Sequence, residues 1–95
     1  MVVRLNGEFD HRTQAALREG FAWITGPVII DLSHAWLAAA GLGEVMALAK
    51  RIGIENVILA DPTPIMRRIL AVTQIDRVLS VRLLENVTPL YKKTA

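Results

Sequence analysis

The sequence predicts an α/β fold in which short apolar strands alternate with amphipathic helices. Three segments, 2–5, 28–32 and 57–60, are short, rich in aliphatic and β-branched residues, and followed by turn or polar residues. Between them, apolar residues recur at three- and four-residue steps, which is the period of a helix. Strands that alternate with helices predict a sheet with right-handed crossovers. The chain has 95 residues, the length of one domain, so we expect a single domain over residues 1–95.

The first half of the chain is expected to hold two strands and two helices. The strand over 2–5 stops at Asn6-Gly7, and Asp10 is a suitable N-cap for a helix that Gly26-Pro27 ends. The nearly continuous apolar run 28–32 indicates a central strand of a parallel or mixed sheet. A loop then leads to a second helix, which starts at Gly41 or earlier, near Ala38. Its apolar face consists of Leu42, Val45, Met46, Ala49 and Ile52, and Gly53 follows its end.

The second half begins with the strand 57–60 and a clear helix start. Thr63 can cap this third helix, and Pro64 stands at its first position, where a missing N–H costs nothing. A short fourth strand is expected over 78–81, and a final helix over 83–91 that Pro89 limits. The predicted order is therefore β-α-β-α-β-α-β-α. The third helix should bury the stripe Ile65, Met66, Ile69 and Leu70 and point Arg67 and Arg68 outward.

Composition excludes several classes of function. The absence of cysteine excludes disulfides and thiolate metal sites and fits a cytoplasmic protein. No apolar run reaches the length of a membrane span, and the start lacks the layout of a signal peptide. The net charge of +2 is spread along the chain, which argues against a nucleic-acid partner. The 53% of hydrophobic residues indicates either a tight aliphatic core or an additional apolar surface for a partner.

No residue pattern predicts catalysis, a metal or a cofactor. His11 and His34 are far apart in sequence and lack a second ligand at metal-binding spacing. Ser33 and His34 are adjacent and follow a strand, so we expect their side chains to point different ways, and no Gly-x-Ser-x-Gly elbow is present. Gly41-Leu42-Gly43 begins like a dinucleotide fingerprint, but Met46 occupies the third glycine position. The residues alone therefore predict a binding module rather than an enzyme.

Three segments, in this order, carry a resemblance to a known family. They are 5–13 (LNGEFDHRT), then 31–33 (DLS) with 41–43 (GLG), and finally 59–70 (LADPTPIMRRIL) followed by 75–78 (IDRV). Together they resemble STAS domains, the family of anti-sigma factor antagonists, over about residues 2–82. The resemblance implies a mixed sheet of four or five strands with helices mostly on one face and no enzymatic activity. It also implies a cytoplasmic bacterial regulator of transcription.

The same resemblance implies a partner and a switch. Antagonists of this family bind a serine kinase of the GHKL type that acts as an anti-sigma factor, and so release a sigma factor. The kinase phosphorylates a serine directly before Gly-Leu-Gly. In this sequence that phosphoacceptor position is Ala40, and the family's Asp-Ser-Ser is replaced by Ala38-Ala39-Ala40. We therefore expect a domain that phosphorylation cannot switch at this position.

The alanines leave two interpretations open: a domain held permanently in its partner-competent state, or one that has lost the switch and been repurposed. Trp36 is either an interface anchor or a core aromatic at the end of a loop. Two further functions are considered: a STAS subunit of a membrane transport complex that docks on an ABC-type ATPase, which needs no phosphoserine, and small-ligand binding. The expected partner surface consists of Trp36, Ala38, Ala39, Ala40, Gly41, Leu42, Gly43, Glu44, Ala47, Arg67 and Arg68, with Lys50 beside it.

Overall fold

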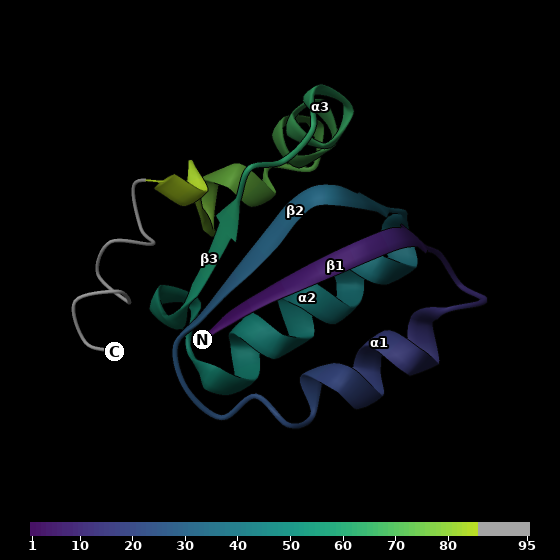
Figure 1. Cartoon of the computed structure of the whole chain (residues 1–95), viewed down its shortest axis with the longest axis vertical. Coiled ribbons are helices and arrows are strands. Elements are labelled where there is room, and N and C mark those ends of the chain that lie inside the picture. The colour runs from purple at the N-terminus through teal and green to yellow at the C-terminus, as the bar shows by residue number, and fades with distance from the viewer. Residues whose placement is uncertain (86–95) are drawn as a thin grey trace.

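The computed structural model describes residues 1–85, which form four strands, three α-helices and two short 3₁₀ helices (Figure 1). The predicted α/β class is confirmed. The sheet has the order β1-β2-β3-β4, and all four strands are parallel, so the expected mixed sheet does not occur among these residues. The predicted final helix falls mainly on residues 86–95, outside the described part of the chain.

The elements are β1 (Val2–Phe9), α1 (Gln14–Phe21), β2 (Val28–Leu37), α2 (Ala39–Ile52), η1 (Ile54–Asn56), β3 (Val57–Ala60), α3 (Pro64–Val72), η2 (Ile75–Arg77) and β4 (Ser80–Arg82).

Each strand pairs with the strand that follows it in the chain, and the helices provide the crossovers. Because parallel strands must restart at the same end of the sheet, every connection carries a helix. Helices α1 and α2 lie next to each other on one side of the sheet, and α3 lies near the end where β2 and β3 finish (Figure 1). The side chains that fill the space under α1 and α2 alternate along the central strands: Val28, Ile30 and Leu32 of β2, and Val57 and Leu59 of β3.

Strands β1 and β2 are longer than predicted. β1 continues through Asn6-Gly7 to Phe9, and β2 continues through the polar pair Ser33-His34 to Leu37. Gly7 has φ +100°, which glycine adopts without strain, so the pair that resembled a turn is accommodated inside a strand. A register shift opposite the Arg4–Asn6 segment lets the buried face of β2 resume after the polar pair.

The first helix begins later than predicted. α1 starts at Gln14, because the Asp10 carboxylate accepts hydrogen bonds from the backbone N–H and the guanidinium of Arg12 instead of capping the helix. These bonds hold the pKa of Asp10 below its ordinary value. The hydroxyl of Thr13 in turn accepts from the N–H of Asp10 at 3.0 Å. The segment 10–13 is therefore a hydrogen-bonded turn that links β1 to α1.

The third helix begins as predicted. The Thr63 hydroxyl accepts a hydrogen bond from the Met66 N–H at 3.2 Å, and Pro64 occupies the first helical position. Met66 and Leu70 are fully buried. The prediction for Ile65 is wrong, since 64% of this residue is exposed; a helix that contacts the sheet along one narrow stripe leaves its neighbour in solvent. The fourth strand covers 80–82 rather than 78–81.

Candidate functional site

The segment that carries the alanines is the start of α2. β2 ends at Leu37, Ala38 is the N-cap with extended backbone angles, and the helix runs from Ala39 to Ile52. No side chain caps this end, because Ala38 has no oxygen to offer the first N–H groups. Of the two starts that the sequence allowed, the earlier one occurs. Ala40 is therefore inside the first helical turn, and Gly41 to Gly43 belong to the helix rather than to a loop.

Gly41 and Gly43 are glycines for different reasons. A Cβ on Gly41 would lie 2.8 Å from the carbonyl oxygen of Phe9 and 3.1 Å from the Phe9 Cβ, so this glycine lets α2 approach the end of β1. A Cβ on Gly43 would meet no atom of residues 1–85 within 4 Å. Packing explains the first glycine and not the second. Gly43 is exposed in the helix, where glycine costs about 1 kcal/mol relative to alanine.

Small residues cover one exposed side of α2. Ala39, Gly43 and Ala47 are all exposed and stand four positions apart, so they share one side of the helix. We call these three residues the α2 strip. Lys50 follows on the same side of the helix and is exposed as well. Without long side chains, the strip offers helix backbone and methyl groups to a partner at close range.

The strip borders a groove between α1 and α2. This cavity has a volume of about 300 Å³ and is lined mainly by apolar atoms. The guanidinium of Arg51 crosses to α1 and donates to the carbonyl of Phe21 at 2.7 Å. Arg18 lines the same groove, and its side chain is mostly exposed. The groove shares Ala47 with the strip, so an apolar side chain with a nearby acidic group would complement this surface.

Glu44 does not belong to the exposed surface that we predicted. Only 8% of it is exposed, because its carboxylate turns toward α1. Arg18 donates to it at 3.1 and 3.0 Å and Gln14 at 2.8 Å. The hydrogen bond from Arg18, followed by that from Gln14, holds the pKa of Glu44 below its ordinary value and raises the pKa of Arg18. Glu44 therefore links the two helices, and its place in the expected partner surface is a wrong prediction.

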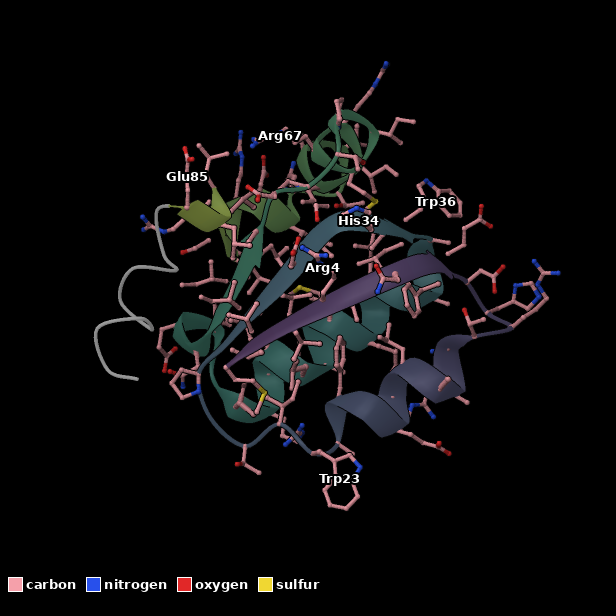
Figure 2. All side chains as sticks on the ribbon, viewed as in Figure 1. Arg4, Trp23, His34, Trp36, Arg67 and Glu85 are labelled. Atoms are coloured by element: carbon pink, nitrogen blue, oxygen red, sulfur yellow. The ribbon has the colours of Figure 1, made fainter. Side chains whose placement is uncertain are left out.

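The remaining predicted residues do not form one site. Gly41 and Leu42 are buried, and Ala38 and Ala40 are half-buried. Trp36 lies on β2 and is 41% exposed, so the expectation of a core aromatic is wrong. Arg67 and Arg68 are exposed on α3, and Figure 2 shows Arg67 on the side of α3 away from Trp36. On α2 the exposed part of the expected surface is reduced to the α2 strip, while Trp36 lies on β2 and the two arginines lie on α3.

A buried carboxylate that the sequence did not single out lies on the sheet face opposite α1 and α2. Asp31 is 2% exposed and accepts hydrogen bonds from Arg4 Nε at 3.1 Å and from the Ser33 N–H at 2.9 Å. Burial raises the pKa of Asp31, but the bonds from Ser33 and Arg4 outweigh it and hold the pKa below the ordinary value. Ser33 Oγ lies 3.0 Å from Nδ1 of its neighbour His34, so the prediction that these two side chains point different ways is wrong. The register shift at this point of β2 interrupts the regular alternation of side chains. These contacts stabilise the irregular part of β2, which gives the Asp-Leu-Ser segment a structural role.

The strand order β1-β2-β3-β4 of residues 1–85 contains no reversal, which is the place where open α/β sheets bind their ligands. Within the same range, no group of three or more His, Cys, Asp or Glu side chains is arranged to hold a metal ion. Along this part of the chain, no helix combines the length and the apolar character needed to cross a membrane. A scan against protein-family models gave no match for this chain, and a search of curated proteins gave none either.

Proposed function

We propose that this chain is a non-enzymatic protein-interaction domain similar to the anti-sigma factor antagonists. Its partner is a GHKL-type serine kinase that acts as an anti-sigma factor in the bacterial cytoplasm, and its binding releases a sigma factor. The α2 strip and the groove beside it form the contact surface. The proposal depends on the sequence resemblance over residues 2–82 and on the properties of this surface.

The observation that carries the proposal is the exposed Gly43. Glycine in a helix reduces stability, and at this position no neighbouring atom requires it. Its absence of a side chain keeps the strip flat between Ala39 and Ala47, so that a partner can approach the helix backbone closely. A residue that costs stability and is not needed for packing is explained by recognition.

The same surface explains how binding would be regulated. Ala40 has no hydroxyl, so a kinase bound here has no acceptor at the position where the family is phosphorylated. A phosphate at a helix start adds about −1.5 to −2 charges at neutral pH, and in the family this charge ends the complex. In this chain the complex is not released in that way, and its amount depends on the abundance of the two proteins.

A second function is favoured by the same alanines. A STAS subunit of a membrane transport complex that binds an ABC-type ATPase needs no phosphoacceptor, which fits Ala40. It would use the same exposed side of α2. The two proposals differ in the partner rather than in the surface.

Affinity capture from the native cell tests the proposal and separates it from the second function. The baits are the wild-type chain, Gly43→Arg, and Val72→Arg as a matched control. Both variants add an arginine at an exposed helical position: Gly43 has open space around it, and Val72 is 76% exposed at the far end of α3. Far-UV circular dichroism confirms that each variant is folded.

We expect the wild type and Val72→Arg to capture an anti-sigma kinase and Gly43→Arg to lose it. Recovery of an ATPase with membrane subunits and no kinase would support the second function instead. Equal capture by all three baits would contradict the role of the α2 strip. With the captured kinase and ATP, intact mass should show no phosphate on the wild type and one on Ala40→Ser. A phosphate on Ser33 of the wild type would contradict the absence of a switch.

A further inference from the structure

Among residues 1–85, the longest edge of the sheet without a strand neighbour is the outer edge of β1. In this part of the chain β1 has eight residues and pairs only with β2, whereas the other edge strand, β4, has three residues. Edge strands present unpaired N–H and C=O groups, and proteins normally keep them short or protect them. An edge of this length without a strand neighbour is therefore a surface whose partner needs to be identified.

The backbone geometry shows which residues face outward. The carbonyl of Met1 accepts from the Ile29 N–H, and that of Phe9 accepts from the Ala38 N–H, both at 2.9 Å. Since backbone groups alternate sides along a strand, odd-numbered residues of β1 bond to β2 and even-numbered ones point to the free edge. The outward groups belong to Val2, Arg4, Asn6 and Glu8. The Thr13 hydroxyl donates to the Glu8 carbonyl at 3.3 Å, and this oxygen can accept a second bond.

Apolar side chains accompany this edge. Met1 and Val2 are 55% and 44% exposed, and Trp23, which follows α1, is 85% exposed. Met1 and Trp23 line an apolar groove of about 310 Å³ that runs between β1 and α1 and also contains Val3 and Phe9. Figure 2 shows Trp23 projecting from the molecule below α1. Exposed apolar side chains next to an open edge are typical of a site for strand addition.

We propose that the edge of β1 pairs with β1 of a second copy of this chain, antiparallel about a two-fold axis at Asn6. In this register Arg4 of each copy stands opposite Glu8 of the other, and Val3 stands opposite Phe9. All outward-facing residues in the pairing are even-numbered, as hydrogen-bonded antiparallel pairs require. The self-complementary charges identify the occupant as a second copy, because an isologous interface needs the same patch to pair with itself.

The charges also select the register among those that the hydrogen bonds allow. Moving the axis to Leu5 would place Glu8 opposite Val2 and Arg4 opposite Asn6. Moving it to Arg4 would place the two arginines opposite each other, which is unfavourable. Only the axis at Asn6 places both Arg4 and Glu8 opposite a residue of opposite charge. Arg4 then lies between Glu8 of the second copy and Asp31 of its own chain. The two sheets then form one sheet of eight strands with the α1 helices on the same face.

Substitutions at Asn6 test this interface. Asn6 is exposed and lies on the axis, so Asn6→Lys and Asn6→Asp each place like charges opposite each other in their own dimer. Sedimentation velocity over a concentration series should give a wild-type dimer of twice the 10.5 kDa chain mass. Each variant alone should raise the dissociation constant by up to about fivefold. An equimolar mixture of the two should restore dimers of wild-type affinity, because lysine then faces aspartate.

A second measurement does not depend on charge. The chain has no cysteine, so Asn6→Cys introduces a single thiol that a short bismaleimide should cross-link within the dimer. Val2→Cys is the control, since it keeps both charge pairs and in the proposed register the two Val2 side chains are far apart. A wild type that stays monomeric throughout the series overturns the proposal. So does a dimer that the Asn6 variants leave unchanged, a mixture that does not recover, or equal cross-linking at positions 2 and 6. The affinity capture that tests the α2 strip does not depend on the β1 interface, so the failure of one proposal can be told from the failure of the other.

Discussion

Replacing Gly41 with alanine should destabilise the protein, although the same change at Gly43 should stabilise it. In both cases the helix gains about 0.8–1 kcal/mol, because alanine has a higher helix propensity than glycine. At Gly43 nothing opposes this gain, since a new Cβ meets no atom within 4 Å. We expect the free energy of unfolding of Gly43→Ala to rise by about 0.5–1 kcal/mol.

At Gly41 the new Cβ would be only 2.8 Å from the Phe9 carbonyl oxygen and 3.3 Å from Cδ2 of Leu37. This carbonyl cannot move freely, because it accepts the hydrogen bond from the Ala38 N–H. Overpacking of this kind costs about 1–3 kcal/mol. After subtraction of the gain in propensity, the free energy of unfolding of Gly41→Ala should fall by up to about 2 kcal/mol.

Urea unfolding followed by circular dichroism measures the free energy of unfolding of both variants. An unchanged m-value shows that a shift of the midpoint reflects a change in stability. The two variants should differ by about 2 kcal/mol, which is well above the error of the method. If Gly41→Ala is as stable as Gly43→Ala, the close approach of α2 to β1 is wrong. The distinction between a packing glycine and a recognition glycine would then be lost.

Further substitutions test the other elements. Thr63→Ala removes the cap on the Met66 N–H and should lower the free energy of unfolding by about 1 kcal/mol in urea; an unchanged value would contradict the cap. Met66→Ala should cost about 2–5 kcal/mol because Met66 is fully buried, whereas the exposed neighbour Ile65→Ala should change stability by less than about 0.5 kcal/mol. The lowered pKa of Glu44 means that its contribution to stability is present above its usual pKa of 4.5 and lost as the pH falls through the lowered value. Thermal unfolding of Glu44→Gln should therefore show a deficit at neutral pH that shrinks in acid, and a deficit independent of pH would contradict the Arg18 contact.

The strands and helices with strong local signals could be predicted from the sequence. The run 57–60 is apolar throughout and predicts a buried strand. Thr63-Pro64 predicts a helix start, because the Thr63 side chain can cap the helix and the Pro64 ring suits its first position. Gly53 follows the end of α2 with φ +105°, as a glycine at this position predicts. In each case the information is contained in neighbouring residues.

Features that depend on distant residues could not be predicted. Asn6-Gly7 has the composition of a turn, and only pairing with β2 keeps it extended. Glu44 has the spacing of an exposed residue until Gln14 and Arg18, 30 and 26 positions earlier, are brought to it by the packing of α1. The buried position of Asp31 likewise depends on Arg4 of another strand. Exposure could therefore be predicted where burial follows the helix period, and not where a partner on another element turns the side chain inward.

The consecutive strand order has a consequence for how this chain folds as it is made. Each of these strands pairs with the next strand to be synthesised, and residues that pair in the sheet are no more than 29 positions apart. Within residues 1–85 no strand pairs with a segment from the opposite end of this range, so the entropy of loop closure is similar at each step. The unit β1-α1-β2 can therefore assemble first and serve as a template for β3 and then β4. We expect folding to proceed from the N-terminus, so that the outer edge of β1 forms before β3 and β4 join the sheet.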